Sequence, residues 1–175
     1  MMKNWKKLAT TDVLKGRIFK YCKVKSQSPD GTKTGDFDQI KFSNWVNIIP
    51  LTADKNVIMV KQYRHGTEKV TLEIPGGAVE MGEEDLVAAT RELLEETGFA
   101  GVKTRLIGTV DANPAFQTNT CKTYLVEDCT KVSDQSLDYF EEIEVVEIPL
   151  QQINGLIKDG TISHSLVIAA FYFLL

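Results

Sequence analysis

The spacing of apolar residues changes at the breaker Pro75-Gly76-Gly77, and this change limits the folds that the chain can adopt. Before the breaker, apolar and polar residues alternate over short segments separated by turn residues, as they do in β-strands. After it, apolar residues between Glu83 and Thr97 recur every three or four positions, as they do along one side of an α-helix. The sequence therefore predicts a mixed α/β class.

The remaining segments extend this pattern on both sides of the breaker. Strands are predicted at Gly16–Val24, Asp38–Phe42, Trp45–Leu51, Val57–Tyr63, Val70–Ile74, Val102–Val110, Lys122–Val126 and Ile143–Ile148. Further helices are predicted at Leu150–Lys158 and Ser163–Leu174. Turn chemistry between the first two strands indicates an N-terminal antiparallel sheet. Because 175 residues suit one core and no linker divides them, we expect a single domain over residues 1–175.

Three glutamates mark one face of the helix predicted at Glu83–Thr97. At about 100° per residue, Glu92, Glu95 and Glu96 fall within a sector of roughly 100°, turned away from the apolar stripe. Like charges at this spacing repel one another. They form either a solvated acidic surface or a site for a hard divalent cation, for which oxygen ligands select Mg²⁺ or Mn²⁺. The Pro75-Gly76-Gly77 turn can bring backbone groups close to such a centre.

The spacing within Gly77–Phe99 decides between these two interpretations. The segment matches the pattern G-x5-E-x7-R-E-U-x-E-E-x-G-U, with U apolar, at every specified position. The chain therefore resembles the Nudix hydrolases. That resemblance implies an α/β/α sandwich around a mixed sheet, here with an N-terminal antiparallel strand extension.

The resemblance also implies a site and a chemistry, namely metal-assisted attack of water on a diphosphate. Its implied metal ligands are Glu92, Glu95, Glu96 and the Gly76 carbonyl, and its cofactor is Mg²⁺, with Mn²⁺ as a substitute. The structural positions of the motif are Gly77, Glu83, Arg91 and Gly98. Of these, Gly98 also suits the left-handed conformation that commonly follows the last turn of a helix.

Segments outside the motif resemble the ADP-ribose and nucleoside-diphosphate-sugar pyrophosphatase branch. They are Val60–Arg64, Glu73–Gly77 and Pro114, although Ala112-Asn113-Pro114-Ala115 replaces the usual Ser-Pro-Gly-like turn of that branch. A nucleotide-sugar substrate is implied, with Arg64, Glu73 and Pro114 as substrate-binding residues. The Arg64 guanidinium suits bidentate phosphate contact, and Glu73 either orients it or binds a ribose hydroxyl. Alternatively, Arg64 is an exposed cation at the end of a strand, and Glu73 is a charged residue of an edge strand with no role in binding.

A carboxylate that activates water is implied in the late loop. Glu142 is the first candidate and Glu141 the second, with Glu144 nearby. The loop aromatics Phe116, Tyr139 and Phe140 either stack on a nucleobase or, more commonly, cover an edge of the core. His65 either reaches substrate or is a loop histidine, and His164 is interpreted as an end-of-helix residue.

Two other functions compete with cleavage of nucleotide sugars. One is a nucleoside triphosphate or dinucleoside polyphosphate pyrophosphatase, and the other is a sensor that binds nucleotide without cutting it. The Gln62-Tyr63-Arg64 segment and Pro114 favour the cleavage of nucleotide sugars over the triphosphate alternative, and the complete set of helix glutamates favours an enzyme over a sensor.

Composition and charge exclude several partners. A net charge of −4 and the absence of any Lys/Arg block argue against nucleic acid. The apolar tail Leu166–Leu175 is shorter than the roughly 20 residues that span a bilayer, and is expected to be a packed helix. Three cysteines without CxxC spacing suit a reducing cytoplasm. The family resemblance further implies a homodimer paired through a strand-rich extension, residues 1–45.

Overall fold

The computed structural model describes residues 2–174, which form two compact units. The smaller unit contains the chain up to Ser43 together with Asp111–Thr120, and the larger unit contains Asn44–Val110 and the chain from Cys121 onward. Leu175, the last residue of the predicted apolar tail, lies outside the described residues. Within residues 2–174, no helix is long and apolar enough to cross a membrane.

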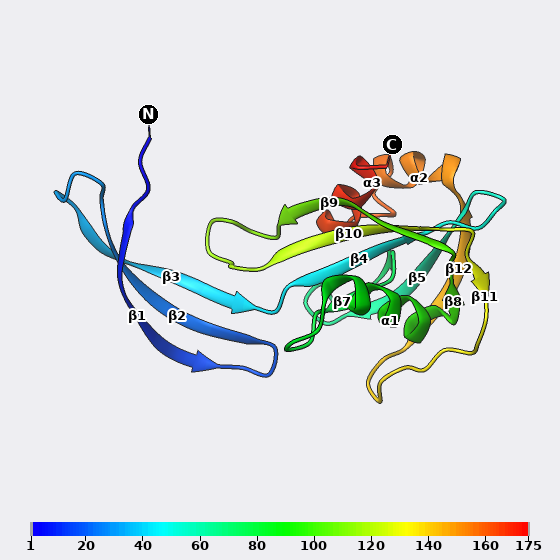
Figure 1. Cartoon of the computed structure of the whole chain (residues 1–175), viewed down its shortest axis with the longest axis horizontal. Coiled ribbons are helices and arrows are strands. Elements are labelled where there is room, and N and C mark those ends of the chain that lie inside the picture. Colours follow the sequence, from blue (N-terminus) through cyan, green and yellow to red (C-terminus); the bar gives the residue numbers. More distant parts are fainter. Residues whose placement is uncertain (1, 175) are drawn as a thin grey trace. The chain divides into compact units, whose positions relative to one another are not determined.

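The smaller unit is built on a three-stranded antiparallel sheet of order β1-β2-β3 (Figure 1). Its strands are β1 (Lys6–Lys15), β2 (Phe19–Gln27) and β3 (Thr34–Phe42). The predicted N-terminal antiparallel sheet is confirmed, but β1 was not predicted, and β3 begins four residues before the strand predicted at Asp38–Phe42. All of β1 is exposed, so no buried face gives it an alternating pattern; it is defined by its pairing with β2.

The larger unit contains nine strands in three sheets. The four-stranded sheet has the order β7-β4-β10-β9, from β4 (Trp45–Pro50), β7 (Gly76–Ala78), β9 (Lys103–Asp111) and β10 (Thr120–Glu127). The three-stranded sheet has the order β12-β5-β6, from β5 (Asn56–Arg64), β6 (Lys69–Glu73) and β12 (Ile143–Pro149). The short strands β8 (Phe99–Ala100) and β11 (Thr130–Lys131) pair with each other. Since β4 pairs with β10 in parallel and with β7 antiparallel, the first sheet is mixed.

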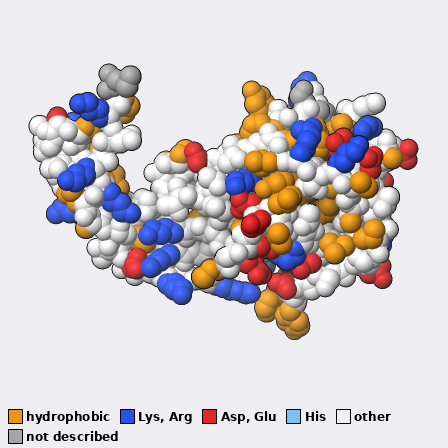
Figure 2. All heavy atoms as spheres, in the orientation of Figure 1, with side chains coloured by type: hydrophobic (Ala, Val, Ile, Leu, Met, Phe, Trp, Pro, Cys, Tyr) orange, Lys and Arg blue, Asp and Glu red, His pale blue; other side chains and the backbone are white. Residues whose placement is uncertain are grey.

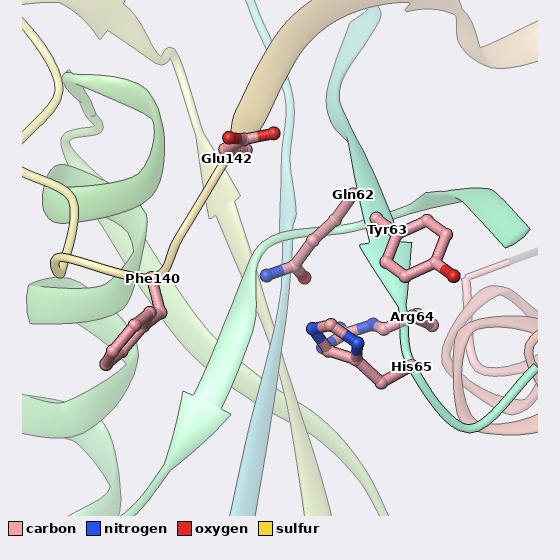
Figure 3. Close-up of a pocket in the computed structure, with 6 residues that line it drawn as sticks. All are labelled: Gln62, Tyr63, Arg64, His65, Phe140 and Glu142. Atoms are coloured by element: carbon pink, nitrogen blue, oxygen red, sulfur yellow. The ribbon is translucent and has the colours of Figure 1, made fainter. Parts of the chain in front are cut away.

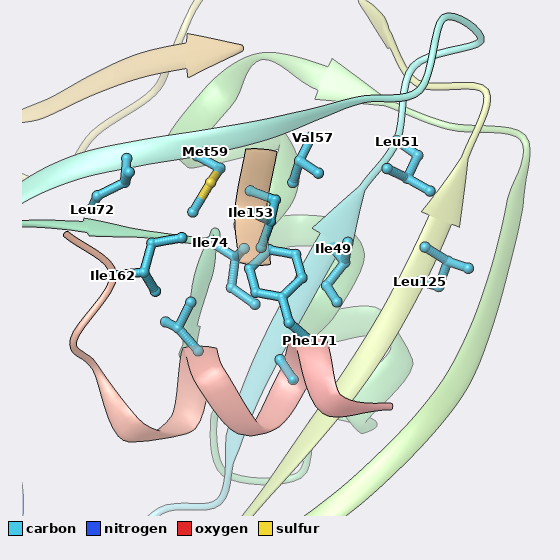
Figure 4. Packing of buried hydrophobic residues seen from close by; sticks show 12 residues of the cluster. Ile49, Leu51, Val57, Met59, Leu72, Ile74, Leu125, Ile153, Ile162 and Phe171 are labelled. Atoms are coloured by element: carbon cyan, nitrogen blue, oxygen red, sulfur yellow. The ribbon is translucent and has the colours of Figure 1, made fainter. Parts of the chain in front are cut away.

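Helices cover both faces of these sheets: α1 (Asp85–Thr97) packs on one side, and α2 (Leu150–Lys158) and α3 (Ser165–Tyr172) on the other. Successive residues of β4 point to opposite faces of the sheet and so reach different helices. Ile48 of β4 packs in one core with Leu93 of α1. Its neighbour Ile49 packs in the other core with Ile153 of α2 and Phe171 of α3 (Figure 4). The predicted α/β/α sandwich is therefore confirmed.

The ends of α1 follow the chemistry expected of them, with one correction. Gly98 adopts the left-handed conformation, φ 73°, and its N–H donates to the carbonyl of Leu94. The helix begins at Asp85 rather than at the predicted Glu83, because Glu84 is extended and serves as the N-cap. Glu83 is thus left in the preceding turn, where its carboxylate accepts a hydrogen bond from the Glu80 N–H.

Candidate active site

Two glycines bring the backbone of β7 against neighbouring groups. A β-carbon at Gly76 would lie 2.4 Å from the carbonyl oxygen of Val46 in the paired strand β4. A β-carbon at Gly77 would lie 2.1 Å from Oε1 of Glu92 in α1. Both distances are shorter than van der Waals contact, so only glycine permits these approaches. The glycines of the predicted turn therefore belong to a short strand, β7, which pairs with β4 and packs against α1.

Glu96 is the most deeply buried of the three helix glutamates. Its residue is 5% exposed, and its Oε2 accepts a hydrogen bond of 3.0 Å from the Gly76 N–H. Burial raises the pKa of Glu96 to about 8, against the effect of the Gly76 hydrogen bond. The charges of Glu92 and Glu141 raise that pKa further, whereas Arg64 lowers it. A positive group close to Glu96 would stabilise the charged form of this carboxyl and lower its pKa.

Arg91 joins the other two helix glutamates to the turn before α1. Its Nη1 donates to Glu92 Oε1 at 2.8 Å and to Glu95 Oε2 at 3.0 Å. Its Nε and Nη2 donate to the two carboxylate oxygens of Glu83 at 2.9 and 3.0 Å. These bonds from Arg91 lower the pKa of Glu83 to about 2. Burial raises the pKa of Glu92, although Arg91 opposes that rise.

The donors around α1 suit a hard divalent cation in their chemistry. Glu92, Glu95 and Glu96 offer carboxylate oxygens, and Gly77 leaves the space beside Glu92 free of any side chain. Within residues 2–174, no three acidic, cysteine or histidine side chains already converge in a metal cage, and Arg91 holds Glu92 and Glu95. Figure 2 shows acidic side chains gathered on the surface over α1.

Arg64 and Glu73 form a bidentate ion pair between β5 and β6. The Arg64 Nε and Nη2 atoms each donate to Glu73 at 2.8 Å, and Thr71 Oγ1 donates to Glu73 Oε1 at 2.6 Å. Burial alone would raise the pKa of Glu73, but the hydrogen bonds from Arg64 and Thr71 bring it below its usual value. Glu73 is buried while Arg64 remains partly exposed, so the arginine is oriented and still accessible.

The exposed side of Arg64 faces a pocket of about 380 Å³ (Figure 3). Its lining residues come from the end of β5 and from the loop before β12: Gln62, Tyr63, Arg64, His65, Phe140 and Glu142. The imidazole of His65 packs edge-on against the Tyr63 ring, with centroids 5.1 Å apart. A cation, a neutral amide and an acid therefore share one concave surface with an aromatic ring.

Two candidate acids, Glu141 and Glu142, lie in the loop before β12, and a third, Glu144, lies in β12 itself. The negative charge of Glu141 raises the pKa of Arg64, Glu92 and Glu96. Its carboxylate also accepts a hydrogen bond from the Asp138 N–H at 3.1 Å. Glu142 lines the pocket, whereas Glu144 forms an ion pair of 2.8 Å with Lys61 on β5.

The NUDIX domain family matches residues 41–171 of the chain, which include the pocket and every carboxylate described above. The chain belongs to the Nudix hydrolases. Members of this family generally use divalent metal ions, in agreement with the oxygen donors of α1. The family assignment and the enzymatic class inferred from the Gly77–Phe99 motif are therefore confirmed.

Several known proteins are similar to this Nudix hydrolase over most of their length. The methanol dehydrogenase activator of Bacillus methanolicus is 29% identical over 97% of this chain and 91% of its own. The ADP-ribose pyrophosphatase of Bacillus subtilis (strain 168) is 30% identical over 87% of this chain and 83% of its own. A crystal structure of an ADP compounds hydrolase superimposes with a TM-score of 0.86, covering 99% of this chain and 94% of the other at 22% identity. This last likeness concerns the fold.

The predicted site residues of the Nudix hydrolase fall into two sets. All of them except Pro114 belong to the larger unit, and Pro114 belongs to the smaller one. Gln62 was not predicted as a pocket residue, and non-binding roles were favoured for His65 and Phe140, yet all three line the pocket. One signal was available for Gln62: it precedes Arg64 by two positions, and such residues share a face of a strand.

Proposed function

We propose that this protein is a Mg²⁺-dependent pyrophosphatase for ADP-ribose or other nucleoside diphosphate sugars, which it cleaves to a nucleoside monophosphate and a sugar phosphate. The observation that carries this proposal is the Arg64 guanidinium, which Glu73 holds through two hydrogen bonds and which lines a pocket in the same compact unit as the α1 glutamates. A phosphate-binding guanidinium beside a row of metal-binding carboxylates is suited to a diphosphate. The activity named for the Bacillus subtilis relative supports the choice of substrate.

In this proposal Glu92, Glu95 and Glu96 hold the cation, with the Gly76 carbonyl as a further ligand. Bound Mg²⁺ would neutralise the charge that develops on the diphosphate. The Gly76 N–H keeps Glu96 in place, and Arg91 with Glu83 fixes the turn against the helix. Arg64, oriented by Glu73, binds a phosphate oxygen. Pro114 completes the list of proposed substrate contacts.

The chemical step needs a base for the attacking water. The water oxygen bonds to one phosphorus atom, its proton passes to a loop carboxylate, and the bridging P–O bond breaks with its electron pair on the leaving phosphate. We propose Glu142, or else Glu141, as the residue that accepts this proton. The effect of the Glu141 charge on the pKa of Arg64 and Glu96 supports Glu141, whereas the pocket position supports Glu142.

Product analysis tests the proposed substrate class. The purified protein is incubated with Mg²⁺ and, separately, with ADP-ribose, ADP- and GDP-sugars, dinucleoside polyphosphates and nucleoside triphosphates. We expect AMP and ribose 5-phosphate from ADP-ribose at the highest kcat/KM. Preferred turnover of a triphosphate or a dinucleoside polyphosphate would replace the substrate assignment, and binding without turnover of any compound would indicate a nucleotide sensor.

We also propose a homodimer in which the strand-rich extension, residues 1–45, pairs the subunits. Charge supports this arrangement: residues 1–43 contain ten Lys and Arg against four acids, whereas the rest of the chain contains ten against twenty. Apolar side chains also remain exposed in the smaller unit. They include Trp5, Leu8, Val13, Leu14, Ile18 and Phe37.

The mass in solution tests the dimer. Light scattering at assay concentration should give twice the 19.6 kDa of one chain. Because opposite charges contribute to the pairing, the dimer should dissociate more readily at high salt. A fully active protein with the mass of one chain would refute the proposal. Separately, three buried free thiols support a reducing location such as the cytoplasm.

A further inference from the structure

Two walls of the pocket are formed by side chains of different character (Figure 3). Phe140 lies on one side of the pocket, Arg64 and His65 lie on the other, and Gln62 lies between them. The polar wall is fixed, because Glu73 holds Arg64 through two hydrogen bonds and Tyr63 packs against His65. The aromatic wall comes from the loop before β12.

The Phe140 side chain does not pack in the hydrophobic core. It is 79% exposed and its neighbour Tyr139 is 93% exposed, and the two rings pack only edge-on, with centroids 4.8 Å apart. The role favoured by the sequence, covering a core edge, is therefore wrong for this ring. Leaving an aromatic face in water forgoes the free energy of its burial. A ring exposed in this way at the wall of a pocket is available to a ligand.

The loop that carries Phe140 is anchored on both sides. Before the ring, Gln135 Nε2 donates to the carbonyl oxygens of Glu96 at 2.6 Å and Ile143 at 3.2 Å. The Ser136 N–H donates to the carbonyl of Glu95 at 2.9 Å. After the ring, the chain enters β12 at Ile143. The ring therefore projects from a segment whose two ends are tied to α1 and β12, so its position is defined relative to the helix glutamates.

A ligand of the proposed kind has two halves that differ in how they can use an aromatic wall. A nucleobase has a flat π-face, and stacking on an aromatic side chain contributes about 1–3 kcal/mol per base. The sugar half presents hydroxyl groups, which gain little from a phenyl ring and keep their hydrogen bonds in water. The phosphates between the halves are drawn to Arg64.

We propose that Phe140 is a specificity-determining residue that stacks on the nucleobase of the substrate, with His65 as the facing wall of the same subsite. The inference rests on the proposed function and adds to it the half of the substrate that occupies this pocket. It predicts selection for the base, with purines preferred to pyrimidines because their larger rings stack over a larger area. It predicts little selection among sugars by Phe140.

The substitution Phe140→Leu tests the inference, because it keeps an apolar side chain and removes the ring. Phe140→Trp restores an aromatic face, and Tyr139→Leu is the matched control, an exposed ring of the same loop outside the pocket lining. KM and kcat are measured in two series. One varies the base on a constant ribose (ADP-, IDP-, UDP- and CDP-ribose), and the other varies the sugar on a constant adenine.

For Phe140→Leu we expect KM for ADP-ribose to rise roughly 5- to 100-fold, with kcat within about twofold of wild type. The increase should be smaller for the pyrimidine compounds and equal across the adenine series. Phe140→Trp should bring KM back from the Phe140→Leu value toward that of the wild type, and Tyr139→Leu should retain wild-type values. An unchanged KM in Phe140→Leu, or a change that follows the sugar instead of the base, would overturn the inference.

Calorimetric titration with AMP separates this inference from the proposed activity. The wild type should bind AMP, Phe140→Leu should bind it about 5- to 100-fold more weakly, and both should bind ribose 5-phosphate equally. This pattern would support the base subsite even in a protein that hydrolysed none of the assayed compounds. Absence of AMP binding by the wild type, or equal AMP affinity in the two proteins, would refute the subsite whatever the hydrolytic activity.

Discussion

The α-carbon of Gly77 lies against the carboxylate of Glu92 so closely that a β-carbon at position 77 would be 2.1 Å from Oε1 and 2.2 Å from Cδ. The two residues come from different elements, β7 and α1. A side chain at position 77 would force the carboxylate to another rotamer, away from the backbone that it now faces. Gly77 therefore allows the orientation that the Glu92 carboxylate, one of the proposed metal ligands, adopts.

Replacing Gly77 with Ala should displace Glu92 and lower the affinity for Mg²⁺ by about 10- to 100-fold, as loss of a group that orients a metal ligand typically does. Titration calorimetry with Mg²⁺ measures this. Gly155→Ala is the control, because no atom would lie within 4 Å of the new β-carbon and the residue is inside α2. That variant should bind Mg²⁺ normally and unfold at the same or a slightly higher temperature. Equal affinities in the two variants would contradict the placement of Glu92.

Replacing Glu96 with Gln should reduce turnover by at least about 10²-fold, because a neutral amide is a poorer ligand for a hard cation. Without added metal, the variant should be as stable as the wild type or more so, since Gln lacks the proton that Glu96 keeps in the folded protein and releases from the unfolded chain above about pH 4.5. Mg²⁺ should raise the Tm of the wild type and raise that of the variant less. Glu84→Gln, at the exposed N-cap of α1, should behave as the wild type. Normal turnover by Glu96→Gln would remove Glu96 from the site.

Stability without divalent metal should depend on pH through Glu96. Burial raises its pKa from 4.5 to about 8, so between these values the folded protein retains a proton that the unfolded chain releases. The free energy of unfolding therefore falls as the pH rises from about 4.5 to 8, and the contribution of this proton is lost above 8. Urea denaturation in EDTA at several pH values should show a steeper fall for the wild type than for Glu96→Gln. Parallel curves would mean that Glu96 ionises normally in the folded protein.

The three late carboxylates can be ranked by single Gln substitutions. Loss of a general base should lower kcat by about 10²–10⁴-fold with little change in Mg²⁺ affinity. We expect this at Glu141, whose charge raises the pKa of Glu96, or at Glu142, which lines the pocket. Glu144→Gln should retain turnover, because that residue pairs with Lys61 on the adjacent strand. Near-normal kcat in all three variants would place the base elsewhere.

The sequence was informative where function requires particular residues at fixed spacing along one helix. The Gly77–Phe99 pattern predicted α1, its glycine terminus and the family, because these features are local. It was less informative where structure depends on partners distant in sequence. Strand β1 has no buried face to give it a pattern, and the bond from Gly76 to Glu96 joins residues twenty positions apart. The exposure of Phe140 likewise depends on how its loop is anchored, not on its neighbours in the chain.

The anchors of the loop before β12 have a consequence for divergence within such a fold. Gln135 and Ser136 fix the loop to the C-terminal turn of α1, and β12 fixes its other end. Residues 137–140 lie between these anchors. Substitutions there should not move the α1 glutamates. Surface segments of this kind tolerate substitution and insertion better than the elements they connect. A gene encoding this chain could therefore exchange one substrate preference for another by small steps in a few codons, while the diphosphate chemistry is inherited unaltered.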